Sequence, residues 1–336
     1  MGRILCGLSR GLIGVTGQVY GCECLFFDRP YLRESFKIWS GTFISFCIII
    51  FEPFSQYLSY KDIASTTCLL TLLELILVYL FLPESPAWLQ YRGRFVEMEK
   101  SRQELGVPQS ALDDQAIMYS HPRRKHQSFA EKLNRDDVYK PLIATVVLSV
   151  MNSFAGAHQV LVHESANKIY AVNNIRAHHG RNAFFLRSLI FGSNIVLAIV
   201  IPYLGFKKMV YIGLTLLSIS LVLYAGMYAS NALHLKDMII VMISLSFDVG
   251  MFNLNYMLLA YVFPVDAKGL SSIGLAVVNL LSPFAMICHP FLRSILDFWI
   301  YVAYAVLDVL IIIWVRHFLP EVAGKTQSEI RHFFFR

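Results

Sequence analysis

Charged residues are scarce in this sequence. Only 15% of its 336 residues are Asp, Glu, Lys or Arg, whereas soluble globular proteins carry about 25%. Hydrophobic residues make up 56% of the chain, and its mean hydropathy is +0.54. This balance excludes an ordinary soluble domain and indicates a protein that spans a lipid bilayer.

The patterns of enzymes and of metal-binding proteins are also missing. The six cysteines show no paired metal spacing and lie in or beside apolar segments, which favours a packing role. The sequence contains no His-rich metal box, nucleophile elbow or phosphate-binding loop, and the pair His178-His179 has no further spaced ligands. We therefore expect no enzyme activity, no metal and no cofactor.

The net charge of +6 does not predict a nucleic-acid partner. The basic residues form short clusters between apolar segments, where orientation rules place cytoplasmic loops. Placing these clusters in the cytoplasm is self-consistent, and it puts the C-terminus inside and the N-terminus outside. The predicted location is therefore a multi-pass position in the plasma membrane, with the lipid bilayer as a partner.

Nine apolar segments are long enough to cross a hydrocarbon core, which needs roughly 20 residues per helix. They cover residues 4–25, 38–58, 63–82, 141–162, 184–204, 209–229, 237–263, 270–291 and 299–319. Backbone groups cannot remain unpaired in lipid, so each segment is expected to be a helix. The sequence predicts an all-α membrane protein with about nine transmembrane helices.

A charged stretch divides these segments into two groups. Residues 1–82 hold three segments, and residues 141–319 hold six. The intervening residues 83–140 are expected to form a cytoplasmic linker with short helices at 95–106 and 110–119. Residues 320–336 then form a cytoplasmic tail.

Two related motifs mark the ends of these groups. Pro83-Glu84-Ser85-Pro86-Ala87-Trp88-Leu89 follows the third segment, and Leu319-Pro320-Glu321 follows the ninth. With Gly2-Arg3 near the start and Phe263-Pro264 before the eighth segment, the chain resembles the sugar-porter branch of the major facilitator superfamily. It is similar to the insect facilitated trehalose and glucose transporters, and it matches spans four to twelve of that family.

The resemblance implies helical bundles of the major facilitator type, of which the N-terminal one is incomplete here. It also implies facilitated transport of a hexose or of trehalose by alternating access, without a cofactor. A sugar site needs amides, hydroxyls and aromatic faces between helices. The candidate sugar-binding residues at positions of the family's motifs are Asn152, Ser153, His158, Asn255 and Tyr256. Further candidates are Gln159 and His163, which follow the first motif, and Asn279, which follows the Phe263-Pro264 passage. The alternative is that these polar groups pair with neighbouring helices.

The fourth and seventh apolar segments each give a specific prediction about the shape of their helix. Asn152, Gln159 and His163 recur at helical spacing, so one face of a continuous helix could carry them. In the seventh segment, Asn255 and Tyr256 stand where the family has a proline and a tryptophan. The proline break of that helix is therefore expected to be lost.

The resemblance further implies a cytoplasmic latch, in which acids at the ends of spans pair with bases in the loops. The residues at the matching positions are Glu23, Arg29, Glu84, Arg92, Lys207, Lys208, Lys268 and Glu321. Arg94 is a further candidate in the first half. Lysine cannot form the bidentate fork of arginine, so a weaker latch is expected in the second half.

Three hypotheses follow, of which sugar transport is the first. The second is a transporter-like membrane protein that does not transport, acting as a sensor or partner, or an incomplete gene product. The third, a membrane enzyme, has little support. The sequence does not predict the sugar, the direction, proton coupling or the oligomeric state.

Overall fold

The computed structural model describes most of the chain from residue 58 onward. The described residues are 16–17, 19–21, 23–24, 42–43, 46–47, 49–50, 58–109, 112, 129–161, 176–230, 232, 235–252, 262–263, 269–321, 325 and 333. Every regular element within these ranges is a helix. The prediction of an all-α protein is confirmed.

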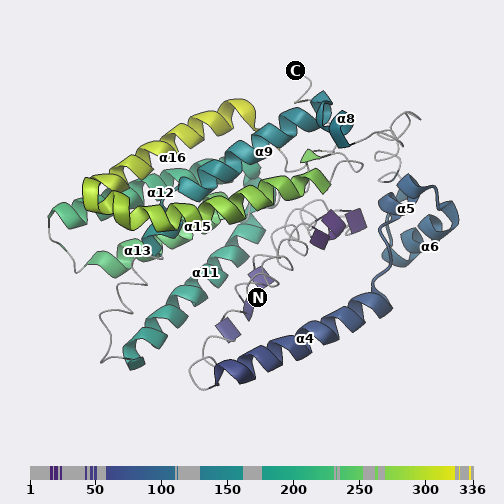
Figure 1. The fold of residues 1–336 in the computed structure, drawn as a ribbon, viewed down its shortest axis with the longest axis horizontal. Coiled ribbons are helices and arrows are strands. Elements are labelled where there is room, and N and C mark those ends of the chain that lie inside the picture. The colour runs from purple at the N-terminus through teal and green to yellow at the C-terminus, as the bar shows by residue number, and fades with distance from the viewer. Residues whose placement is uncertain are drawn as a thin grey trace.

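Six helices pack together into one group. They are α9 (Asp136–Phe154), α11 (Arg176–Leu204), α12 (Phe206–Ala229), α13 (Lys236–Phe247) with its π-helical continuation η3 (Asp248–Phe252), α15 (Ser271–Leu296) and α16 (Trp299–Phe318). α12 contacts both α13 and α16, and α9 contacts α15 and α16. The six correspond to the six apolar segments predicted after residue 140 (Figure 1).

The core of this group is made of apolar side chains from several helices. Leu214, Leu217 and Leu221 lie on one face of α12 and are fully buried, and Tyr301 and Ile311 of α16 are buried with them in one cluster. The outward faces of the same helices expose leucine, isoleucine and valine. A soluble protein would hide such faces, whereas a bilayer solvates them.

α12 and η3 approach each other closely at two glycines. A Cβ atom added to Gly213 would lie 2.1 Å from the Cα atom of Gly250, and one added to Gly250 would lie 2.8 Å from the Cα atom of Gly213. Small residues allow this backbone contact, which is a common way of packing helices in lipid. The two glycines therefore set the distance between these helices.

Four helical stretches in the described part of the chain have the length and hydropathy to cross a membrane. They are Lys61–Phe81, Asp136–Leu161, Phe206–Ala229 and Trp299–Phe318. Ser188–Leu204 is a shorter apolar stretch within α11. The predicted segments 4–25 and 38–58 fall largely outside the described residues.

α4 (Tyr60–Phe81) lies apart from the six-helix group (Figure 1). Its first turn is fixed by a capping box, in which the Ser59 hydroxyl accepts from the Asp62 N–H and the Asp62 carboxylate accepts from the Ser59 N–H. Leucine and isoleucine side chains are exposed all around α4. This helix therefore presents an apolar surface of membrane-spanning length.

The linker contains a small helical unit. α5 (Pro86–Arg92) and α6 (Phe95–Leu105) contact each other, and each ends at a glycine with a left-handed backbone. Their core contains Ala87, Leu89 and Met98. The predicted helix 95–106 is confirmed as α6, whereas α5 was not predicted. The predicted helix 110–119 lies outside the described residues apart from Leu112.

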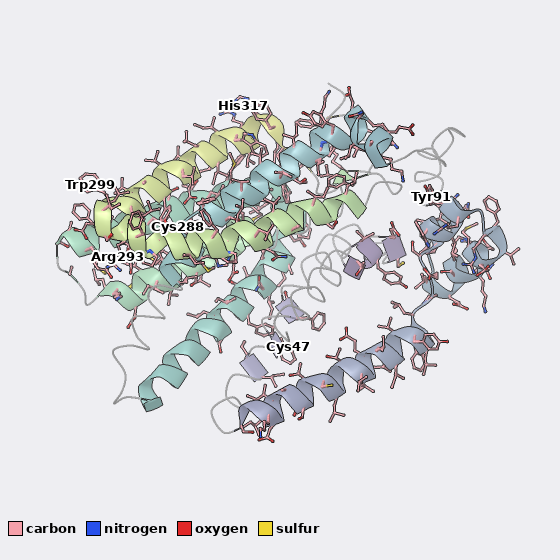
Figure 2. All side chains as sticks on the ribbon, viewed as in Figure 1. Cys47, Tyr91, Cys288, Arg293, Trp299 and His317 are labelled. Carbon is pink, nitrogen blue, oxygen red and sulfur yellow. The ribbon has the colours of Figure 1, made fainter. Side chains whose placement is uncertain are left out.

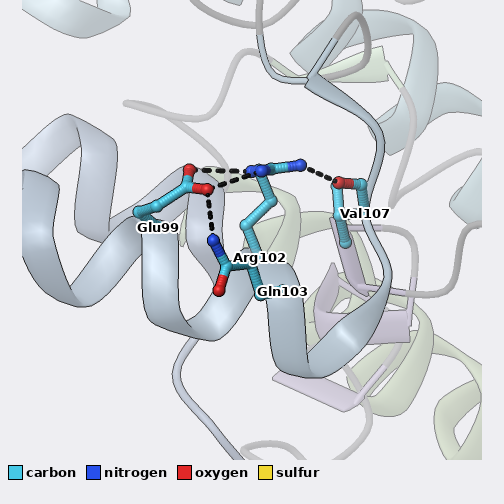
Figure 3. A network of polar contacts seen from close by, with 4 residues as sticks. All are labelled: Glu99, Arg102, Gln103 and Val107. Carbon is cyan, nitrogen blue, oxygen red and sulfur yellow. Dashed lines mark hydrogen bonds and ion pairs between the residues drawn. The ribbon is translucent and has the colours of Figure 1, made fainter.

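Figure 3 shows a polar network on α6 that lowers the pKa of Glu99. The Glu99 carboxylate accepts hydrogen bonds from the Arg102 guanidinium at 2.5 and 2.8 Å and from the Gln103 amide at 2.8 Å. These donors, Arg102 first, lower the pKa of Glu99 from its ordinary value of 4.5 to about 2. A lowered pKa favours the folded state above pH 4.5, and this contribution is lost as the pH falls through about 2.

We expect the carboxyl ¹³C chemical shift of Glu99 in the full-length protein to titrate well below pH 4. Arg102→Gln should return the pKa of Glu99 toward its ordinary value, because the largest cause of the shift is removed. A wild-type midpoint near 4.5 would contradict the network.

Candidate functional site

The fourth predicted segment contains a break rather than a continuous helix. α9 ends at Phe154, Gly156 has a left-handed φ of +82°, and the chain is helical again from Ala157 to Leu161. A left-handed backbone favours glycine because it has no Cβ atom. Broken helices within a membrane protein are typical of substrate sites in transporters, where freed backbone groups and polar side chains gather.

Polar side chains from two helices meet at this break. The Gln159 amide nitrogen donates to the Ser153 carbonyl oxygen at 2.6 Å, across the break. The Ser153 hydroxyl donates to the Ser149 carbonyl oxygen and accepts from the Ser282 hydroxyl of α15 at 3.1 Å. These bonds join both sides of the break to α15. We call Ser149, Asn152, Ser153, Gln159 and Ser282 the α9 polar cluster.

Several buried atoms of this cluster have no hydrogen-bond partner among the described residues. They are the Asn152 side-chain oxygen, the Gln159 side-chain oxygen and the Ser149 hydroxyl, all of them inaccessible. Asn152 and Gln159 are only 5% and 2% exposed. A buried polar group without a partner costs about 1–3 kcal/mol. Amides and hydroxyls held in this state are suited to a ligand that is itself rich in hydroxyl groups.

The structure separates the predicted sugar-site residues. Asn152, Ser153 and Gln159 come together in the α9 polar cluster. His158 instead packs edge-on against Phe247 of α13, with ring centroids 4.6 Å apart. Asn279 lies on α15 but is exposed, so its side chain does not enter the cluster. The residues His163, Asn255 and Tyr256 lie outside the described part of the chain.

The continuous face expected for the fourth segment is interrupted. The backbone turns at Gly156, so the spacing of Asn152 and Gln159 does not place them along one helix. The Gln159 side chain instead reaches back across the break to the Ser153 carbonyl oxygen, beside Asn152 in the sequence. Ser149 and Ser282 were not predicted as part of the site. A signal for them was present in Ser282-Pro283, since proline frees backbone groups that nearby hydroxyls can satisfy.

The seventh predicted segment also departs from a regular α-helix. Its residues Asp248–Phe252 form the π-helix η3. Short π-helical turns often occur at functional sites, because one extra residue shifts the side chains that follow. The positions matching the family's prolines follow η3 and lie outside the described residues.

Glu321 makes the contact that was expected of the second-half latch, but with different donors. Its carboxylate accepts from the backbone N–H of Phe206 at 2.7 Å and of Lys207 at 3.1 Å. A carboxylate at a helix N-terminus is favoured by the unpaired N–H groups there and by the helix dipole. The Lys207 ammonium donates instead to the Arg316 carbonyl oxygen at 3.3 Å. The Glu321 carboxylate therefore joins the residues after α16 to the first turn of α12 through the main chain of α12.

Of the other bases predicted for the second half, Lys208 has an exposed side chain and Lys268 lies outside the described residues. Among the described residues, the donors to Glu321 are therefore two backbone N–H groups. Gly205, with φ of +83°, turns the chain so that these donors face Glu321.

The first half has a corresponding contact at its own Pro-Glu motif. Glu23 is 5% exposed, and its carboxylate accepts from the Ser85 hydroxyl at 2.5 Å. The Tyr20 hydroxyl donates to the Pro83 carbonyl oxygen at 2.7 Å. The Ser101 hydroxyl of α6 donates to the Glu84 carbonyl oxygen at 2.5 Å. These bonds tie the motif to α6 and to the first predicted segment.

The bases proposed for the first-half latch lie elsewhere. Arg92 stacks over the Trp88 ring, 4.7 Å from its centroid, and Arg94 forms an ion pair with Glu97. Glu84 acts on Arg94 only as a minor electrostatic neighbour, after Glu97, so the pairing of these bases with the motif acids stays a prediction. Both bases are held by partners within α5 and α6, which are closer in sequence. Arg29 lies outside the described residues.

Replacing Glu321 with alanine is expected to weaken the contact between α12 and α16 by about 1–3 kcal/mol, because two N–H donors lose their acceptor. Thermal unfolding of the purified protein measures this change. Glu84→Ala is the matched control, since the Glu84 side chain is exposed. Its expected effect is within about 0.5 kcal/mol. Equal losses for the two variants would contradict the assignment.

The fold matches that of a membrane transporter. The solved structure of the proton:xylose symporter XylE bound to 6-bromo-6-deoxy-D-glucose superimposes on the chain with a TM-score of 0.78. That match has 19% sequence identity and covers 99% of this chain and 73% of XylE, which comes from E. coli. The helices thus define a protein of the major facilitator fold.

Sequence comparison gives the family. The family model described as "Sugar (and other) transporter" matches residues 1–334. The facilitated trehalose transporter Tret1 of Apis mellifera ligustica is 23% identical over 99% of this chain and 68% of its own length. The glucose transporter GlcP of Staphylococcus epidermidis is also 23% identical, over 99% of this chain and 75% of its own length. This chain belongs to the Sugar (and other) transporter family.

Proposed function

We propose that this protein carries a hexose or trehalose across the plasma membrane by facilitated transport, with the sugar held at the α9 polar cluster. The observation that carries the proposal is a set of buried amide and hydroxyl atoms beside the break in α9 that have no partner in the part of the chain the structure describes. Sugar hydroxyls can donate to the Asn152 and Gln159 oxygens and accept from the Ser149 hydroxyl. The cluster is neutral, as suits an uncharged sugar.

The names of the relatives support this substrate class. One is called a facilitated trehalose transporter and another a glucose transporter. The substrate would form its own hydrogen bonds at the break, and α9 would rearrange there as the protein alternates between states. The left-handed Gly156 gives the backbone a point at which two helical pieces can change their angle.

The contacts of Glu321 and Glu23 are compatible with a transporter that alternates between two states. Glu321 holds the N-terminal end of α12 against the C-terminal end of α16, and Glu23 holds the first Pro-Glu motif. We propose that both contacts lie on the cytoplasmic side, together with the linker 83–140 and the tail 320–336. Residues 1–82 would then belong to the N-terminal bundle and residues 141–319 to the C-terminal bundle.

Binding of labelled glucose and trehalose to the purified full chain tests the site. Asn152→Ala and Gln159→Ala should each weaken binding roughly 3- to 10-fold, the effect of one neutral hydrogen bond. Gln103→Ala removes an exposed amide of α6 and should leave binding unchanged. Folded protein that binds neither sugar would overturn the proposal. A loss in Gln103→Ala equal to the other two would overturn the assignment of the site.

A further inference from the structure

His289 is a buried histidine of α15 that lies outside the α9 polar cluster. Its side chain is 1% exposed, and α15 contacts both α9 and α16. Figure 2 labels its neighbour Cys288, which lies where α15 passes through the six-helix group. A polar ring buried among the helices of a membrane protein is costly unless its atoms form hydrogen bonds. The partner of His289 therefore indicates its role.

That partner is Tyr304 of α16. The His289 Nδ1 atom and the Tyr304 hydroxyl oxygen are 3.0 Å apart, which is a hydrogen-bond distance. The two rings also stack, with centroids 5.8 Å apart and planes inclined by 26°. A hydrogen bond and a ring contact together restrict the Tyr304 side chain to one orientation. α15 therefore determines where this ring of α16 lies.

The Tyr304 ring packs directly on the break in α9. A Cβ atom added to Gly156 would lie 2.7 Å from two carbon atoms of the Tyr304 ring. Gly156 is the residue with left-handed backbone that separates the two helical pieces of the fourth segment. Packed groups in a protein interior leave few voids, so the ring and this backbone cannot move independently. A shift of Tyr304 must therefore change the angle between the two pieces.

α15 reaches the same break at a second point. Ser282 precedes His289 by seven residues, about two helical turns, so the two lie on one face of α15. The Ser282 hydroxyl donates to the Ser153 hydroxyl at 3.1 Å, just before the break. One face of α15 thus contacts α9 directly through Ser282 and contacts the break through His289 and Tyr304.

We propose that His289 is a positioning residue for the sugar site, which it serves by holding Tyr304 against the break. The inference rests on the sugar binding proposed above. The Asn152 amide precedes the break and the Gln159 amide follows it, so the angle at the break sets the distance between them. Both amides can reach one sugar only at the right angle, and small misplacements of binding groups are costly. His289 acts through Tyr304 and does not touch the sugar.

Hydrogen–deuterium exchange of the purified full chain tests this contact without any sugar. His289→Leu and Tyr304→Phe should each speed exchange of the backbone amides in residues 155–161 by roughly 3- to 10-fold, the effect of one buried hydrogen bond. The double variant should show less than the product of the two effects, because the two side chains share one bond. Exchange at the wild-type rate in both single variants would overturn the inference.

Two further variants separate the hydrogen bond from a general loss of packing. His289→Asn should keep the wild-type exchange rate, because asparagine carries a hydrogen-bonding atom as many bonds from the main chain as Nδ1. Tyr224→Phe is the matched control, since it removes a buried tyrosine hydroxyl that bonds to Tyr228 within α12. It should leave exchange in residues 155–161 unchanged. Exchange in Tyr224→Phe as fast as in Tyr304→Phe would overturn the inference.

Binding of labelled glucose and trehalose then shows whether the contact positions the site. His289→Leu and Tyr304→Phe should bind sugar roughly 3- to 10-fold more weakly than wild type, and His289→Asn and Tyr224→Phe should bind it equally well. Faster amide exchange with unchanged sugar affinity would overturn the positioning role and leave the proposed function standing. Wild-type protein that binds neither sugar, while amide exchange responds as expected, would overturn the proposed function and leave the contact between His289 and the break established.

Discussion

Replacing Gly213 with alanine is expected to destabilise the six-helix group by about 3 kcal/mol or more, because the new methyl group meets backbone rather than a movable side chain. Its Cβ atom would lie 2.1 Å from the Gly250 Cα atom and 2.3 Å from the Gly250 nitrogen. α12 and η3 would have to separate. Thermal unfolding of the purified protein should show a lower midpoint, and the yield of monodisperse protein should fall.

The matched control lies on the same helix. Gly226 is also in α12, and a Cβ atom there would have no neighbour within 4 Å. Gly226→Ala should therefore be neutral or should stabilise α12 by up to about 1 kcal/mol, since alanine is the better helix former. Unfolding midpoints that fall equally in the two variants would show that helix packing at Gly213 is not the cause.

Replacing Gly156 with alanine is expected to give the largest loss of transport. Alanine at φ of +82° is strained by about 1–2 kcal/mol, and its Cβ atom would lie 2.7 Å from the Tyr304 ring. Either the break in α9 straightens or Tyr304 leaves His289. Both outcomes displace the α9 polar cluster, so sugar exchange should fall at least about 100-fold, as small misplacements of positioning groups can do.

Gly106→Ala is the control that separates the effect of backbone strain from the effect of the clash with Tyr304. Gly106 has a φ of +65° at the end of α6, and its added Cβ atom would meet nothing within 4 Å. This variant should lose only the strain energy, about 1–2 kcal/mol, and keep its sugar exchange. If Gly156→Ala exchanges sugar as well as Gly106→Ala does, the break is not part of the site.

The helices were predictable because lipid leaves the backbone few alternatives. A long apolar segment must pair its own N–H and C=O groups, so hydropathy predicts that it is a helix and where it lies, though α11 begins eight residues before the predicted 184. α12 and α16 lie within three residues of the predicted segments 209–229 and 299–319. The short helix α5 escaped prediction because it has only seven residues between Pro86 at its first turn and the Gly93 cap, too short for a hydropathy pattern to reveal.

The candidate site was only partly predictable. Asn152, Ser153 and Gln159 stood out because amides and hydroxyls are costly in lipid. Their grouping depends on the turn at Gly156, which is a property of φ rather than of residue type and which helical spacing cannot reveal. His158 has the same polar character but packs on Phe247, because the turn points it toward α13. Ser282 belongs to the cluster through a contact between α15 and α9, which the spacing within one segment cannot predict.

The contacts of the two Pro-Glu motifs show how a departure from a family pattern is accommodated. Ala87 stands where the family has arginine, and it is fully buried in the small core of α5 and α6. Ser85, the N-cap of α5, provides the hydrogen bond to Glu23 instead. In the second half, backbone N–H groups of α12 take the role expected of lysine side chains. Reasoning from side-chain charge missed both, because neither donor is charged.

Counterflow in proteoliposomes tests the central claim most directly. Vesicles loaded with unlabelled glucose or trehalose and diluted into a trace of the labelled sugar should accumulate label transiently, because exchange through a carrier is faster than net loss. The account predicts this overshoot for wild type and for Gln103→Ala, and a much smaller one for Gln159→Ala. Label that enters no faster than into protein-free vesicles, with folded protein confirmed in the membrane, would contradict it.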